Sequence, residues 1–223
     1  MIIESLSLTD FRVFQGLHHF ELAPKKRWNA SRPIILFGGL NGAGKTTVLT
    51  AVRLVLYGKQ SLGPGTSQKN YHDFLRKSIH KSRDSVLQSN HSNITLCFDY
   101  SHMGVSSRFE IKRSWSVTDK KVEESIGIAR DSKNLKDLTY DQKQGFLNEL
   151  IPIGVSDLFF FDGEKIAELA KDQTGSALSD SIKKLLGLDL IDKFIPLSTY
   201  SPDLFPLKSV WSLHLKSDLF FKT

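Results

Sequence analysis

The chain has 223 residues, of which 40% are hydrophobic, 10% aromatic and 24% charged. Such a composition is typical of a globular protein that buries a sizeable core, and it excludes a disordered, collagen-like or disulfide-stapled chain. Thirty Lys and Arg residues against 24 Asp and Glu give a formal net charge of +6, which favours a polyanionic partner.

The single cysteine and the distribution of apolar residues indicate the cellular compartment in which the protein is expected. Cys97 cannot form an internal disulfide, and it lies in an alternating apolar run, so we expect a buried, reduced thiol. The N-terminus lacks the basic start and long apolar stretch of a signal peptide, and no apolar window reaches the ~20 residues that span a bilayer. We therefore expect a cytoplasmic protein with no membrane partner.

The first part of the chain alternates strand and helix patterns. Residues 2–8 and 14–22 predict an opening β-hairpin, and residues 33–37 predict a short strand that is buried on both faces. In residues 46–57 the apolar side chains recur at helical spacing, and Gly58 lies where such a helix would stop. A strand, a glycine-rich loop and a helix are thus expected in immediate succession.

Further along, turn-forming residues in 61–67 predict a loop, and residues 71–83 predict a basic amphipathic helix. The basic side chains of that helix form either a solvated face, which is the commoner situation, or a contact with DNA. Alternation in residues 94–100 and 109–117 predicts an antiparallel β-meander, and residues 142–150 predict a short helix.

The glycine-rich loop carries the chemistry, because residues 39–46 match the pattern G-x-x-x-x-G-K-[ST]. Its glycines let successive backbone N–H groups point inward as a nest for phosphate oxygens. Lys45 adds a positive charge for the β and γ phosphates, and Thr46 offers a hydroxyl to Mg²⁺. A chance match in a strand-to-helix turn is the alternative, which the flanking strand and helix patterns disfavour. We expect a nucleotide to contact Gly39, Asn41, Gly42, Ala43, Gly44, Lys45, Thr46 and Thr47.

A second stretch predicts a metal and water site. The sequence has no Asn-Lys-x-Asp motif of the kind that reads guanine, so ATP is favoured as the nucleotide. Four apolar residues, 158–161, precede Asp162 and predict a buried strand that delivers a carboxylate to the edge of a sheet. Asp162 would hold Mg²⁺ through water, and Glu164 would polarise the attacking water beside Lys45. An ordinary core strand followed by an Asp-Gly turn remains the alternative.

Several stretches together resemble the DndD family, the SMC-like ATPases of bacterial DNA phosphorothioation systems. They are residues 2–14 with Asp10-Phe11-Arg12, the loop 39–47, the strand ending in Arg113-Ser114-Trp115, and Phe159-Phe160-Phe161-Asp162-Gly163-Glu164-Lys165-Ile166. The loop is shared by SMC, double-strand-break-repair and ABC ATPases, whereas the last string is more particular to DndD. The resemblance covers residues 1–194.

The resemblance implies an α/β fold, the N-terminal lobe of an ABC/SMC-type P-loop ATPase head with an antiparallel β-meander subdomain. In the family two heads sandwich two ATP molecules, a coiled coil is inserted in the chain, and the partners are DNA and other phosphorothioation proteins. The resemblance also implies that Asp162 occupies the place of the Q-loop, which senses the γ-phosphate and Mg²⁺, and that Arg12 lies near the phosphates. An exposed arginine in a turn is the simpler interpretation of Arg12.

The sequence departs from the family after residue 194, where Ser, Pro and Phe replace the expected Glu- and Lys-rich coiled coil. We therefore expect an ATP-binding lobe, residues 1–194, and an atypical tail, residues 195–223, that is frameshifted or disordered. No signature motif or further Walker B strand is visible, so hydrolysis is expected only when another segment completes the site.

Two functions remain open on these observations. The first is the ATP-binding lobe of a DNA sulfur modification ATPase, and the second is a non-catalytic remnant or inhibitory fragment that docks onto an intact ATPase. A transporter nucleotide-binding domain is disfavoured, because it would need a glutamine near the second strand end and a signature motif.

Overall fold

The computed structural model describes residues 1–27, 30–32, 34–82, 88–102, 104–119, 121–153, 156 and 160, all within a compact unit that spans Met1–Ala170. In chain order the elements are β1 (Ile2–Phe11), β2 (Phe14–Glu21), β3 (Lys25–Arg27), β4 (Ala30–Arg32), α1 (Lys45–Tyr57), the 3₁₀ helix η1 (Gly58–Leu62), α2 (Gln68–Ser78), β5 (His91–His102), β6 (Val105–Val117), β7 (Val122–Arg130), β8 (Lys133–Asn134) and α3 (Tyr140–Leu150).

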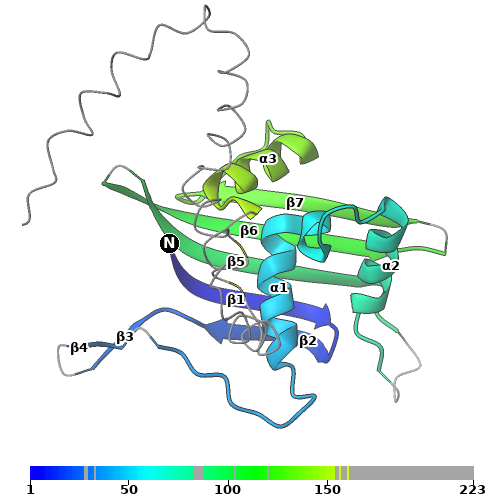
Figure 1. The fold of residues 1–223 in the computed structure, drawn as a ribbon, viewed down its shortest axis with the longest axis horizontal. Coiled ribbons are helices and arrows are strands. Elements are labelled where there is room, and N and C mark those ends of the chain that lie inside the picture. Colours follow the sequence, from blue (N-terminus) through cyan, green and yellow to red (C-terminus); the bar gives the residue numbers. More distant parts are fainter. Residues whose placement is uncertain are drawn as a thin grey trace, which may run out of the picture. The chain divides into compact units, whose positions relative to one another are not determined.

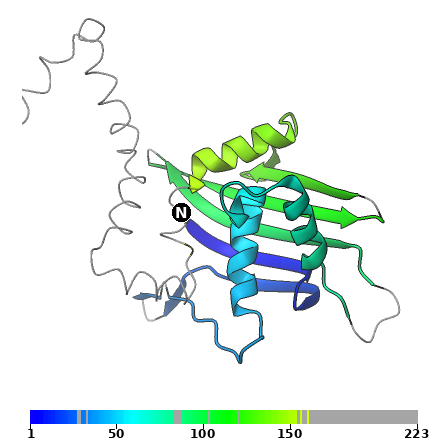
Figure 2. The same cartoon turned by 45° about the vertical axis from the view of Figure 1, so that its right-hand side comes forward.

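Six strands form one antiparallel sheet in the order β2-β1-β5-β6-β7-β8, and β3 and β4 form a separate hairpin. The helices α1 and α2 lie over one face of the large sheet, and α3 lies beside β7 (Figures 1 and 2). Alternation within the strands explains this one-sided cover. In β6, for example, Phe109, Ile111, Arg113 and Trp115 are buried, while the residues between them are exposed or half-exposed.

α1 joins the buried face of the sheet to the glycine-rich loop. Its apolar residues repeat at helical spacing, and Ala51, Leu54 and Val55 are completely buried. The helix contacts β5, β6 and α3. It ends at Tyr57 because Gly58 takes a φ of 52°, a conformation that favours glycine. The predicted helix and its stop are confirmed.

Three further predictions are confirmed: the opening hairpin, the β5–β6 hairpin of the meander, and the helix α3. β1 is longer than predicted, because Asp10 and Phe11 continue the strand to its turn. The sequence patterns did not predict β7, although Ile126 and Ile128 alternate with polar residues in it. Two residues before Ile126, the same inward face of the strand carries Glu124. This charged residue interrupts the apolar alternation and obscures the strand pattern.

The predicted strand at residues 33–37 is wrong for the residues that the structure describes. Residues 34–37 have no strand pairing, and Ile34 and Leu36 are 86% and 90% exposed. A strand that is buried on both faces takes its hydrogen bonds and its cover from neighbouring strands. In the described part of the chain no strand pairs with this run, so Ile34 and Leu36 stay open, while the ring of Phe37 packs edge-on against that of Phe20 in β2.

The predicted helix at residues 71–83 is correct in kind but wrong in its bounds. α2 begins earlier because the hydroxyl of Ser67 accepts a hydrogen bond from the backbone N–H of Asn70 at 3.1 Å, which caps the helix. It ends earlier because Ile79 is extended and forms a β-bridge with Phe11. The β-bridge between Phe11 and Ile79 therefore replaces the last turn of the predicted helix.

The basic face of α2 has the contacts of a solvated helix surface. Arg76 lies 3.4 Å from Asp73 on the same helix, which is the arrangement of a solvated helix face.

The single cysteine is less buried than the sequence predicted. Cys97 is a free, half-buried thiol rather than a fully buried one, and burial raises its pKa.

Some predictions lie outside the described residues. These are the strand at 158–161, except for Phe160, and the tail at 195–223. None of the helices in the described ranges combines the length and the apolar character that crossing a membrane requires.

Candidate functional site

The glycine-rich loop is shaped by close packing and by left-handed backbone. A Cβ atom placed on Gly39 would lie 2.9 Å from the Cβ of Ala43, closer than side-chain carbons pack. Gly42 and Gly44 have φ angles of 85° and 100°, a region that favours glycine. Larger side chains at these three positions would therefore distort the loop.

Lys45 is the first residue of α1, and its side chain reaches back across the loop. Its Nζ donates hydrogen bonds to the carbonyl oxygens of Gly39 at 2.7 Å and of Leu40 at 2.9 Å. Among the described residues no carboxylate pairs with this exposed ammonium group. The loop thus carries a positive charge that neutral carbonyl groups hold in place, which favours an anionic ligand.

The N-terminus of α1 is open toward the loop. Its N-cap, Gly44, provides no side-chain cap, and the first turn contains no acidic residue. The first amides of a helix lack intrahelical partners and carry partial positive charge, so they favour an anion. Thr46 is exposed in this turn, whereas Thr47 is 7% exposed. A ligand in the loop can therefore reach the hydroxyl of Thr46. The side chain of Thr47 is buried, so a ligand would contact only the backbone of that residue.

The turn between β1 and β2 packs against the loop. A Cβ atom on Gly44 would lie 2.7 Å from Cζ of Phe14 and 2.9 Å from Cγ2 of Val13. These two side chains therefore touch the backbone immediately before Lys45. The opening hairpin, which precedes the loop by some thirty residues in the sequence, forms part of its wall.

Arg12 belongs to the same turn and has a φ of 51°. Its N–H donates to the carbonyl of Ser78 at 2.8 Å, and its own carbonyl accepts a hydrogen bond from Nδ1 of His80 at 2.7 Å. Its guanidinium lies 5.8 Å and 5.2 Å from the ring centroids of Phe11 and Phe74, and burial lowers its pKa. The structure brings the turn to the loop and half-buries the Arg12 side chain against aromatic rings.

The predicted metal and water residues, Asp162 and Glu164, lie outside the described residues, so their roles stay predictions. Of the apolar run before them, Phe160 is described and 9% exposed. Its ring meets the ring of Tyr57 edge-on, with centroids 6.4 Å apart. Phe160 thus contacts the end of α1 that is opposite the glycine-rich loop.

The sequence analysis missed a buried ion pair near the same end of α1. Arg113 in β6 is completely buried, and its Nη1 donates to Oε1 of Glu124 in β7 at 2.5 Å. A signal for this pair exists in the sequence, because both charges occupy inward positions of alternating strands, where apolar residues are expected.

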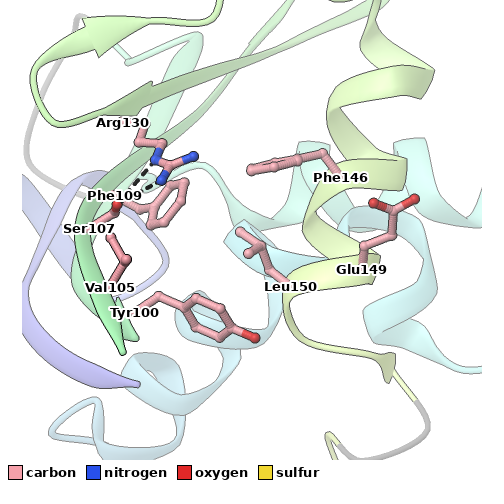
Figure 3. Close-up of a pocket in the computed structure, with 8 residues that line it drawn as sticks. All are labelled: Tyr100, Val105, Ser107, Phe109, Arg130, Phe146, Glu149 and Leu150. Atoms are coloured by element: carbon pink, nitrogen blue, oxygen red, sulfur yellow. Dashed lines mark hydrogen bonds between the residues drawn. The ribbon is translucent and has the colours of Figure 1, made fainter. Parts of the chain in front are cut away.

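A separate cleft of about 540 Å³ lies between the β5–β6 hairpin and α3 (Figure 3). The rings of Tyr100, Phe109 and Phe146 line it, and the guanidinium of Arg130 lies 5.8 Å from the centroid of Phe109. Nε and Nη2 of Arg130 donate to Oγ of Ser107 at 3.1 Å and 2.9 Å. None of the predicted nucleotide residues lines this cleft, so it is distinct from the glycine-rich loop.

The described residues fit a triphosphate that brings its own Mg²⁺. Within the described ranges no group of three or more His, Cys, Asp or Glu is placed to hold a metal ion. Mg²⁺ usually keeps waters, binds phosphate oxygens and takes one or two protein ligands, so the hydroxyl of Thr46 is a suitable ligand beside a nucleotide. Lys45 and the open N-terminus of α1 supply the complementary positive charge.

Comparison with known proteins places the chain in a family. Residues 5–195 match the family AAA_23, which is described as an AAA domain, and the matched span includes the glycine-rich loop and α1. A search of curated proteins gives no match. The chain therefore belongs to this AAA domain family of SMC-like, nucleotide-binding ATPases.

Proposed function

We propose that this chain is the ATP-binding lobe of an SMC-type ATPase that acts in DNA sulfur modification. One observation carries the proposal: in residues 39–46 close-packed glycines, the Lys45 ammonium and an uncapped helix N-terminus meet at one place. The family match supports the ATPase class. The resemblance of residues 159–166 and of the strand ending in Trp115 to the DndD family supports the role in sulfur modification.

Each residue of the loop has a distinct part in this proposal. The backbone amides at Gly42 and Gly44 cradle phosphate oxygens, and Lys45 exchanges its two carbonyl partners for phosphate oxygens. Thr46 holds the Mg²⁺ that arrives with the nucleotide. Arg12 lies in the turn that walls the loop and adds a further positive charge near the phosphates. Bound Mg-ATP supplies the phosphoanhydride bond whose cleavage would do work on DNA.

Hydrolysis would require groups beyond this lobe. We propose that Asp162 and Glu164 contribute to the metal and water site, and that another ATPase segment supplies a signature motif and a Walker B strand. The apolar run at residues 34–37 supports this proposal, because in the described part of the chain no strand pairs with it and Ile34 and Leu36 stay exposed. Lobes of this kind, residues 1–194, would then meet head to head with ATP between them, and DNA and other phosphorothioation proteins would bind the assembled complex.

Titration calorimetry of the purified chain with Mg-ATP tests the binding. We expect saturable binding, and we expect Lys45→Ala to weaken it about tenfold or more, because a charge-assisted contact to phosphate is lost. Lys69→Ala, which removes an exposed lysine of α2, should leave the affinity unchanged. A flat titration of folded protein at millimolar Mg-ATP would overturn the proposal.

A non-catalytic docking fragment is the second candidate, and the open apolar run at residues 34–37 also favours it. Turnover separates the two candidates. The measurement is made in the presence of the ATPase segment that completes the site, because the lobe alone is not expected to hydrolyse ATP. Hydrolysis that Lys45→Ala abolishes then excludes the docking fragment, whereas ATP binding without turnover that depends on Lys45 supports it. Loss of phosphorothioate from cellular DNA when Lys45→Ala is introduced would connect the chain to sulfur modification.

A further inference from the structure

Arg113 is completely buried, yet each of its five N–H groups has an acceptor. Nε and Nη2 each donate to the carbonyl oxygen of Val55 at 3.3 Å, and Nη2 also donates to Oε1 of Gln144 at 2.7 Å. Nη1 donates to Oε1 of Glu124 at 2.5 Å and to the hydroxyl of Tyr140 at 3.1 Å. Removal of one partner from such a set leaves a buried charge unsatisfied, which is strongly unfavourable.

The partners of Arg113 are themselves held in place. Tyr71 of α2 donates to Oε1 of Glu124 at 2.6 Å, and Tyr140 of α3 donates to Oε2 at 3.0 Å. Burial raises the pKa of both tyrosines, so they stay hydroxyl donors. Burial disfavours the charged guanidinium, but the neighbouring Tyr71, Glu124 and Tyr140 outweigh it and raise the pKa of Arg113, which stays a cation.

This saturation argues against a small-molecule site at the network. A cleft of about 420 Å³ adjoins it, lined in part by Tyr71, Glu124 and Tyr140. Every polar atom of the Arg113 and Glu124 head groups is already engaged within the protein. A ligand would have to break these bonds, so the network has a different role.

That role concerns the C-terminal end of α1. The last carbonyl groups of a helix lack intrahelical partners. Here the carbonyl of Val55 accepts from Arg113, and the carbonyl of Leu56 accepts from Nε2 of Gln144 at 3.0 Å. The last turn of α1 contains no basic residue of its own, so Arg113 supplies the positive charge that a helix C-terminus favours.

The approach of Arg113 depends on Gly58, where a Cβ atom would lie 2.8 Å from Nη1 of the guanidinium. α1 has 13 residues and is therefore about 20 Å long, with the glycine-rich loop at one end and the network at the other. A helix is rigid on this scale, so a shift of one end moves the other. Phosphate recognition by backbone amides requires placement within about 0.5 Å.

We propose that Arg113 and Glu124 are positioning residues for nucleotide binding, which hold the C-terminal end of α1 and thereby set where its N-terminal amides and Lys45 lie. Gln144 extends this control to α3, which precedes the run containing Phe160. The inference rests on the proposed function, because it concerns the affinity of the same loop for Mg-ATP.

The test compares Glu124→Gln with Glu123→Gln, its exposed neighbour on the same strand. Titration calorimetry measures Mg-ATP affinity at a temperature where each variant is folded, and thermal unfolding measures its midpoint. Glu124→Gln keeps the side-chain shape but leaves Arg113 without its countercharge, so we expect about tenfold weaker binding. Glu123→Gln should stay within about twofold of the unmodified chain.

A second variant covers the case in which Glu124→Gln does not fold. Gln144→Leu keeps the ion pair but removes the contacts to Arg113 and to the carbonyl of Leu56, and we expect about threefold weaker binding. Hydrogen exchange should also become faster in either variant at the hydrogen-bonded amides of α1, which begin with Val48, whose N–H donates to the carbonyl of Gly44 at 3.0 Å.

The outcomes distinguish this inference from the function on which it rests. Lower unfolding midpoints with unchanged affinity would mean that the network only stabilises the fold, and this inference alone would fail. Absence of Mg-ATP binding by the unmodified chain would overturn the proposed function and this inference together.

Discussion

Gly38 and Gly39 are adjacent, but their surroundings differ. A Cβ atom on Gly39 would meet the side chain of Ala43 at 2.9 Å, whereas nothing lies within 4 Å of a Cβ atom on Gly38. Gly42 and Gly44, in contrast, are required by their positive φ angles. Glycine is therefore required at Gly39 for lack of space and at Gly42 and Gly44 for the backbone conformation, whereas Gly38 meets neither constraint.

This difference predicts the effect of two matched substitutions. Gly39→Ala should weaken Mg-ATP binding about tenfold, because the added methyl group pushes Ala43 away and opens the phosphate nest. Gly38→Ala should leave the affinity unchanged. Calorimetric titration measures both, and both unfolding midpoints should stay near that of the unmodified chain because the loop is exposed. An equal loss in the two variants would show that the contact with Ala43 does not shape the loop.

At the scale of elements, α3 illustrates how a local signal places a tertiary contact. Oγ1 of Thr139 accepts a hydrogen bond from the backbone N–H of Gln142 at 3.3 Å, and Oε1 of Gln142 accepts from the backbone N–H of Thr139 at 2.9 Å. These reciprocal bonds form a capping box that fixes where the helix begins. From this start the helix brings the hydroxyl of Tyr140 to Glu124 in β7, and it brings Nε2 of Gln144 to the carbonyl of Leu56 in α1.

Removal of this cap should have a measurable cost. Thr139→Ala is expected to lower the free energy of unfolding by about 1 kcal/mol, because the N–H of Gln142 loses its acceptor. Urea denaturation measures the change. Thr50→Ala is the control: Thr50 lies inside α1, where alanine is the better helix former, so this variant should not lose stability. A Thr139→Ala variant as stable as the unmodified chain would contradict the capping argument.

At the scale of the whole molecule, the most exposed apolar residues in the described ranges lie in or just before the glycine-rich loop. Ile34, Leu36 and Leu40 are 86%, 90% and 86% exposed. Contiguous exposed apolar surface of this kind marks an interaction site or causes self-association. Leu17, on the edge strand β2, is also exposed, but it is not part of this run.

The run therefore predicts the behaviour of the purified chain at high concentration. We expect concentration-dependent self-association in sedimentation velocity, and we expect the double variant Ile34→Ser with Leu36→Ser to reduce it. The unfolding midpoint should not change, because both side chains are exposed. Leu17→Ser serves as the control and should associate as the unmodified chain does. If the double variant associated equally, the run would not be the contact surface.

The sequence by itself predicted the chemistry of the loop and determined most of the local structure. The spacing of Gly39, Gly44 and Lys45 predicted a phosphate-binding loop, and the structure shows the required glycine geometry there. Alternation predicted the β5–β6 hairpin, and Gly58 predicted the end of α1. These features depend on backbone conformation and on side-chain periodicity, which residues within one or two turns of each other decide.

Only the tertiary structure decided which distant groups meet. Arg113 and Val55 are 58 residues apart in the sequence, and no local pattern pairs them. The bridge from Phe11 to Ile79 ends α2 one turn before the sequence pattern does. The openness of residues 34–37 likewise depends on which strands lie beside them. Burial and hydrogen-bond partners come from neighbours that are remote along the chain, so local preference cannot specify them.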